Sequence, residues 1–255
     1  VGTNDSKSIP GYNPGIVIFK TKKNQIDLIL HISNYHYANG GPWGTIVIGE
    51  KKNIESNYYS KLFLEFFLFG SLLIMAFYHI FMYSLRTKYK ATLYFSFYCF
   101  IIALRTFLTG EKFLFTNTDL NWTLLVKLDF LTFYFGLLIF LLFIYKLFSN
   151  ETQIIINNLY FVVASIYCLI VIFAPFSFLS STLTSYQIIA FFTGIYIFYI
   201  LIRALIKKRD GALILLLGYI LIFITTIHDM LYYQQIVKTT DLISIGLFFF
   251  IFSQA

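Results

Sequence analysis

Seven long stretches of the sequence consist almost entirely of apolar residues, with polar connectors between them. They cover residues 61–85, 91–108, 122–148, 155–174, 183–206, 212–235 and 241–255. Most are comparable in length to the roughly 20 residues that an α-helix requires to cross a bilayer. Because the backbone of a membrane span must satisfy its own hydrogen bonds, the stretches predict helices. We therefore expect an all-α membrane domain at 58–255, a seven-helix transmembrane bundle with antiparallel neighbours.

The composition excludes a soluble globular domain. Only 12% of the residues are charged and 58% are hydrophobic, whereas soluble domains carry about 25% charged residues. The formal net charge is +7, but the basic residues lie in short clusters between the apolar stretches. Such clusters indicate orientation in a membrane and not binding to nucleic acid. The lipid bilayer is the expected partner.

Residues 1–57 have a different pattern, with turn-forming residues and short alternating runs. Apolar residues occupy the even positions of 26–33, which predicts a half-buried strand, and 45–49 predicts its hairpin partner. Glycine and proline at 39–44 supply the turn between them. These strands are too few to close a β-sandwich. We therefore expect the end of a larger β-domain that continues upstream.

Lysine and arginine residues at the span ends predict the orientation. Eight of them fall in connectors on one side: Arg86, Lys88, Lys90, Lys146, Arg203, Lys207, Lys208 and Arg209. The opposite connectors hold only Lys112 and Lys238. Because the positive side is normally cytoplasmic, we expect the N-terminus outside and the C-terminus inside. Lys51, Lys52 and Lys61 oppose this at the first span, but a folded external domain crosses largely regardless of its charge.

Several ionisable residues lie within the predicted spans, where each needs a partner or a role. At about 1.5 Å per helical residue, Arg105 in the second stretch and Asp129 in the third lie at the same depth, near the outer side. His228 and Asp229 in the sixth stretch reach the same outer third. We predict that Arg105 and Asp129 form a salt bridge.

Two interpretations of this outer polar group stay open. Its members can be ion pairs and interfacial side chains that hold the bundle together, which suits Glu65 and Lys127 best because they lie closest to the span ends. Alternatively, the group forms a polar pocket in which ligand binding or domain docking shifts the helix packing. His228 and Asp229 are then also a candidate proton-responsive pair, since histidine titrates near physiological pH.

No catalytic or metal-binding pattern appears in the sequence. The four histidines show no HExxH spacing, the two cysteines form no CxxC pair, and the phosphate-loop and nucleophile-elbow motifs are absent. We expect no cofactor and no enzyme activity in this region. A transporter or channel is the alternative function. Transporter sites are typically formed by spans that Gly or Pro interrupts. Pro175 is the only proline after residue 42, which counts against this alternative.

Several motifs, taken in order, resemble the bacterial seven-transmembrane receptors with diverse intracellular signalling modules. The motifs are ISNYH at 32–36, GGPWG at 40–44, FGSLLIM at 69–75, ALRT at 103–106, KLD at 127–129 and HDMLYY at 228–233. The resemblance covers nearly the whole chain. It implies that 1–57 ends an extracytoplasmic jelly-roll domain related to carbohydrate-binding modules.

The resemblance also implies a location, the bacterial inner membrane, and a function. The protein would sense an extracytoplasmic small molecule or carbohydrate and pass the signal to a cytoplasmic module that follows Ala255 in the same chain. That module would be a diguanylate cyclase, histidine kinase, adenylate cyclase or phosphatase, and assembly as a homodimer stays open. The candidate residues for ligand binding or signal coupling are Arg105, Asp129, His228, Asp229 and Glu111.

Overall fold

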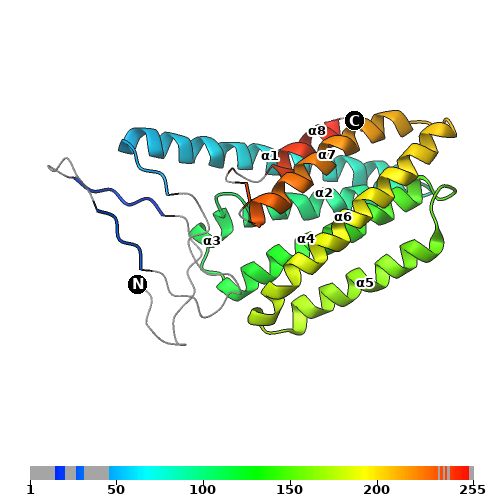
Figure 1. Ribbon diagram of the computed structural model, residues 1–255. Helices are drawn as coiled ribbons and strands as arrows, with labels where there is room; N and C mark the ends of the chain where they lie inside the picture. Colours follow the sequence, from blue (N-terminus) through cyan, green and yellow to red (C-terminus); the bar gives the residue numbers. More distant parts are fainter. Residues whose placement is uncertain are drawn as a thin grey trace.

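The computed structural model describes residues 15–20, 27–31, 46–234, 236–237, 239 and 242–252. Eight helices lie in this part of the chain (Figure 1). They are α1 (Lys51–Leu85), α2 (Lys90–Leu108), α3 (Phe113–Asn117), α4 (Trp122–Leu147), α5 (Ile154–Phe173), α6 (Phe176–Ile206), α7 (Ala212–Tyr233) and α8 (Ile243–Phe252). Six of them, all but α3 and α8, are long and apolar enough to cross a membrane.

These six helices coincide with the first six predicted helical stretches, but two of them begin earlier than expected. Helix α1 begins at Lys51, so the predicted linker at 57–60 is helical. Charged residues hide this first part from a hydropathy search, and Lys51 pairs with Glu55 one turn later at 3.7 Å. Helix α6 begins directly after Pro175, whose fixed φ suits a helix start.

The two ends of the chain are described only in part. Helix α8 has ten residues of the seventh predicted stretch, fewer than a bilayer span requires. The predicted strands are described only at 27–31 and 46–49, which carry no strand, while the turn at 39–44 lies outside the described residues. The jelly-roll domain therefore stays a prediction.

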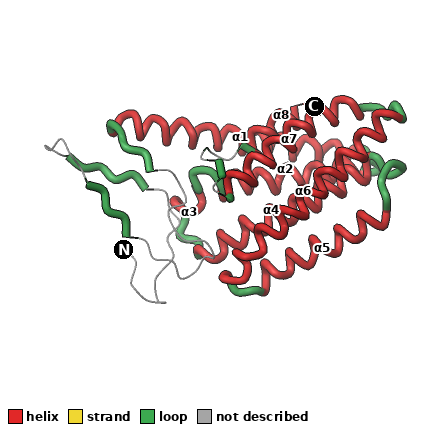
Figure 2. The backbone as a smooth tube through the Cα atoms, in the orientation of Figure 1, coloured by secondary structure: helices red, strands yellow, loops and turns green. Residues whose placement is uncertain are grey.

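The helices pack side by side in a ring, in the order α1, α2, α4, α5, α6, α7, α8 and back to α1. Figure 2 shows the long helices running roughly parallel to one axis, with short connections at both ends of the bundle. The short helix α3 and the connections α5–α6 and α7–α8 lie at one end, which we call the α3 end. The interior of this ring holds the site described below.

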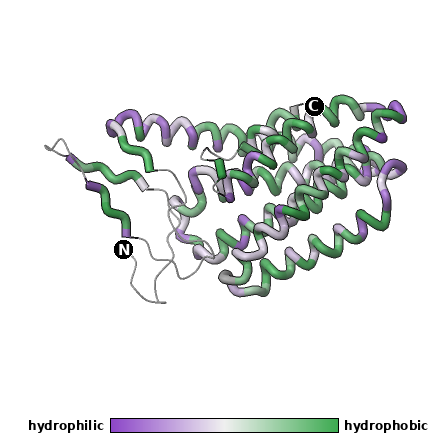
Figure 3. The backbone as a smooth tube through the Cα atoms, in the orientation of Figure 1, coloured by the Kyte–Doolittle hydropathy of each residue, from purple (hydrophilic) through white to green (hydrophobic). Residues whose placement is uncertain are grey.

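The hydrophobic core runs through the ring, while the outer surface is also apolar. Leu72 of α1, Cys99 of α2, Ile144 of α4 and Phe250 of α8 are fully buried in one cluster. Many large apolar side chains instead face outward; Phe173, for example, is 80% exposed. Figure 3 shows apolar residues along the helices and hydrophilic ones mainly near their ends. Such a surface suits lipid and not water.

Helices α7 and α8 approach each other closely at one glycine. A Cβ atom added to Gly246 would lie 3.0 Å from the Cβ of Thr225 and closer still to its hydroxyl. Membrane helices commonly use small residues for such contacts, because lipid gives no hydrophobic force to drive helices together. The contact holds α8 tightly against α7.

Candidate functional site

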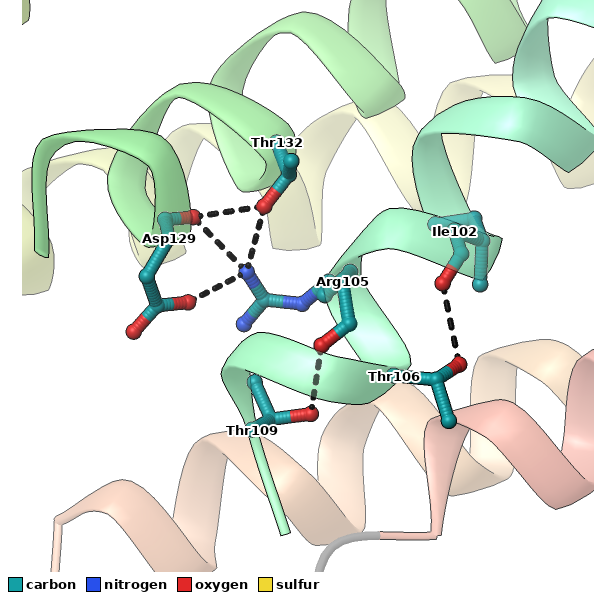
Figure 4. Close-up of polar contacts among 6 residues, drawn as sticks. All are labelled: Ile102, Arg105, Thr106, Thr109, Asp129 and Thr132. Carbon is teal, nitrogen blue, oxygen red and sulfur yellow. Dashed lines mark hydrogen bonds and ion pairs between the residues drawn. The ribbon is translucent and has the colours of Figure 1, made fainter. Parts of the chain in front are cut away.

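Arg105 and Asp129 form the centre of a polar site near the α3 end of the bundle. Nη1 of Arg105 on α2 donates hydrogen bonds to Oδ1 of Asp129 at 2.8 Å and to its backbone carbonyl at 2.9 Å (Figure 4). The arginine is 8% exposed. The predicted salt bridge is therefore confirmed, and it joins α2 to α4.

Neighbouring groups hold the guanidinium in place. Nη1 of Arg105 also lies 3.3 Å from the hydroxyl of Thr132, which itself donates to the Asp129 carbonyl at 2.8 Å. The Arg105 guanidinium lies 5.3 Å from the ring centroid of Phe133, within the range of a cation–π contact. Because a buried charge is costly unless several groups satisfy it, this shell explains how arginine is tolerated here.

Asp229 of α7 binds the first turn of α8. Its Oδ1 accepts the backbone N–H of Leu242 at 2.7 Å, and its Oδ2 accepts that of Ile243 at 2.9 Å. The residue is 5% exposed. The first N–H groups of a helix have no partner within the helix and carry partial positive charge, so a carboxylate stabilises them well. Asp229 thereby fixes α8 to α7.

His228 supports this carboxylate from the side. Its Nδ1 lies 3.0 Å from Oδ1 of Asp229, and its Nε2 lies 2.8 Å from the hydroxyl of Thr239 in the α7–α8 connection. The carboxylate can only accept, so Nδ1 carries the proton of this bond. The histidine therefore joins Asp229 to the segment that leads into α8.

A pocket opens beside these groups, between α2, α4, α6, α7 and α8. Arg105, Asp129 and Asp229 all line it, together with Phe130, Phe133, Gln187, Thr226, Met230 and Tyr233. The empty space among these side chains is about 700 Å³, open solvent at its mouth included. The sequence thus located three of the side chains that line one pocket.

Comparison with known proteins places the chain in a family. A family model described as 7TM diverse intracellular signalling matches residues 61–255. The chain belongs to this family. Comparison with curated proteins and with solved structures gives no significant match. The 7TM diverse intracellular signalling family is a family of membrane signalling proteins, which the bundle of apolar helices fits.

In this family member, the other predicted residues lie away from the pocket. Glu65 of α1 accepts the backbone N–H of Glu111 at 2.7 Å, and Lys61 lies 3.3 Å from the Glu111 carboxylate. These contacts join α1 to the connection before α3. Lys127 donates to the carbonyl of Ile172 in the last turn of α5 at 2.8 Å. Glu65, Glu111 and Lys127 therefore form contacts that are separate from the pocket.

Neutral polar residues complete the site, and the sequence analysis did not single them out. Gln187 of α6 is 7% exposed, and its amide oxygen accepts from Gln234 at 2.7 Å. The hydroxyls of Thr106 and Ser244 lie 3.3 Å apart and join α2 to α8. A search for neutral polar residues at membrane depth would have found Gln187. Among the described residues, no three His, Cys, Asp or Glu side chains gather as a metal site.

Proposed function

We propose that the chain is the membrane part of a receptor that senses an extracytoplasmic ligand, a small molecule or carbohydrate, and relays it to a cytoplasmic signalling module. One observation supports this most strongly: Asp229 lines the pocket and also binds the N-terminus of α8. A change in the pocket therefore acts directly on the group that holds α8.

The relay requires two arrangements of the helices. A ligand or docked domain that binds one arrangement more tightly shifts the population toward it, and differential affinity is all that this needs. Helix α8 is the element expected to differ, because Asp229, Ser244 and Gly246 set its position against α7 and α2. A shift of α8 would then reach the cytoplasmic side along the helix.

We infer that the α3 end lies on the extracytoplasmic side of the membrane. The opposite end carries the basic connectors, where the carboxylate of buried Glu151 accepts from Arg209 at 3.0 Å and lies 3.6 Å from Lys207. The positive-inside rule assigns that end to the cytoplasm.

Cysteine labelling tests this orientation. In a variant without Cys99 and Cys168, Asn117→Cys is expected to react with an impermeant maleimide in intact cells, because residue 117 lies at the α3 end. Lys88→Cys is expected to react only after the cells are permeabilised. Reaction of Lys88→Cys in intact cells would reverse the assignment.

The relay is tested by Asp229→Asn in the full-length receptor. The amide keeps the size of the side chain but loses the charge that faces the α8 N-terminus, an interaction typically of 0.3–1 and up to about 2 kcal/mol. We expect the output of the attached signalling module to change by about 5- to 30-fold at equal receptor level, the factor that one or two kcal/mol gives. His228→Ala is expected to change it in the same direction.

Asp119→Asn is the matched control, because it makes the same chemical change on an exposed residue at the α3 end. Its output should equal that of the unmodified receptor. If Asp229→Asn folds normally and leaves both the basal output and the response to stimulus unchanged, Asp229 has no part in the relay.

A further inference from the structure

The pocket beside Asp229 continues into a second chamber, deeper in the bundle. Both chambers are lined by Arg105, Phe133, Thr226, Met230 and Ile243, so they adjoin along these side chains, and we treat them as two parts of one cavity. We call them the polar chamber and the apolar chamber. On α4, their lining runs from Val126 to Phe140, which spans about 21 Å at 1.5 Å per residue. The cavity therefore suits an elongated molecule.

The polar chamber is lined by one arginine and two carboxylates, Asp129 and Asp229. The Asp229 carboxylate already accepts from two backbone N–H groups of α8, so Asp129 is the carboxylate relevant to a ligand. Three acceptors of α4 hold Arg105 (Figure 4). Among the described residues, Oδ2 of Asp129 has no hydrogen-bond partner, and the Asp129 side chain is 25% exposed. This carboxylate oxygen can accept from a ligand.

Aromatic rings and an amide complete the polar chamber. Phe130 and Tyr233 line it, and aromatic faces next to carboxylates are the usual surroundings of a bound ammonium group. Gln187 also lines it, but its amide oxygen already accepts from Gln234, so it offers no further acceptor. The aromatic rings and the Asp129 carboxylate are the groups that favour a cationic head.

The apolar chamber suits a hydrocarbon body. Its walls include Tyr98, Phe140, Phe191, Tyr219 and Phe223. The Tyr219 hydroxyl donates to the carbonyl of Gly194 at 3.0 Å, so this polar atom is already satisfied. A wall made mainly of aromatic and aliphatic groups binds apolar surface by excluding water.

We propose that this cavity binds an amphipathic organic cation, with its ammonium head at Asp129 and its apolar body in the aromatic chamber. The inference deepens the receptor function above and rests on it for its biological role. The same ammonium chemistry occurs in a single-chain amine and in the head of a bilayer lipid. Thr226 lies at the junction of the two chambers, so a larger side chain there blocks the passage between them.

Photolabelling of the chain in nanodiscs tests the proposal without any signalling readout. The probe is dodecylamine with a photoreactive group on its chain, and the nanodiscs contain only phosphatidylglycerol, which has no ammonium group. We expect saturable labelling of the apolar chamber that unlabelled dodecylamine competes away. A dodecanoate probe of the same chain length should label it at least tenfold less.

Two variants locate the site. Asp129→Asn is expected to reduce labelling by dodecylamine about tenfold, and Thr226→Trp to abolish it, while Asp119→Asn leaves it unchanged. Thr226→Trp leaves the Arg105–Asp129 pair intact. If Asp129→Asn does not fold, the loss of labelling in Thr226→Trp still tests the site. Competition by phosphatidylethanolamine would identify a bilayer lipid as the source of the head.

Equal labelling by the two probes, or stronger labelling by dodecanoate, would overturn the assignment of a cationic head. Labelling that does not saturate, or that Thr226→Trp leaves unchanged, would overturn the site itself. The receptor function is tested separately, because an effect of Asp229→Asn on output would stand even if no amine binds.

Discussion

Replacement of Arg105 by methionine is expected to lower the free energy of unfolding by about 3–5 kcal/mol. The change removes the group that pairs with Asp129 at 2.8 Å and leaves a carboxylate inside the bundle without its counter-charge. Chemical unfolding in detergent micelles, followed by circular dichroism, measures the effect. Lys88→Met is the control, since exposed positions away from such contacts usually change stability by less than about 0.5 kcal/mol.

The double variant Arg105→Met, Asp129→Leu separates the cost of an unpaired charge from the contribution of the pair. A buried ion pair replaced by apolar residues is often neutral in stability, so we expect the double variant to recover most of the loss. A single variant that unfolds within about 1 kcal/mol of the parent protein would show that the pair is effectively solvated.

Gly246→Ala is expected to destabilise the protein by about 1–3 kcal/mol, the usual cost of forcing an extra methyl group into a packed interior. The new methyl group would meet the side chain and Cβ of Thr225, so α8 must move away from α7. The loss should appear in the same unfolding measurement. Thr225→Ala in the same chain removes the hydroxyl and methyl groups and should recover part of it.

Gly70→Ala is the matched control for this change. Both glycines lie in helices, so alanine improves the helix propensity of both by up to about 1 kcal/mol. No atom lies within 4 Å of a Cβ added at Gly70. Gly70→Ala should therefore be neutral or stabilising, and equal stability of the two variants would contradict the close approach of α7 and α8.

The sequence was most informative where one physical requirement dominates. Lipid demands long apolar helices, so the ends of α2, α4 and α7 were predicted to within two residues. The same geometry placed Arg105 and Asp129 at one depth, and their contact followed because a charge in lipid needs a partner. Hydropathy does not detect polar helical segments. The first ten residues of α1, which are mainly polar, were therefore not predicted to be helical.

Contacts between side chains and backbone groups were harder to predict from the sequence than contacts between two side chains. The sequence singled out His228 and Asp229 as a candidate proton-responsive pair, and their side chains do lie 3.0 Å apart. Its bonds to the backbone N–H groups of Leu242 and Ile243 depend on how the α7–α8 connection turns, and no residue pattern reports that. Lys127 likewise binds a carbonyl of α5 and not an acidic side chain. Backbone partners become visible only in three dimensions.

If Asp229 sets the position of α8 in the bundle, loss of its charge should change where α8 lies. Spin labels at Ile206 of α6 and Phe249 of α8, both exposed positions, report the distance between these helices when it is measured by pulsed electron resonance in nanodiscs. Cys99 and Cys168 are first replaced by serine. We expect Asp229→Asn to shift or broaden the distance distribution, while Asp119→Asn leaves it as in the parent protein. An unchanged distribution in a folded Asp229→Asn variant would contradict the claim.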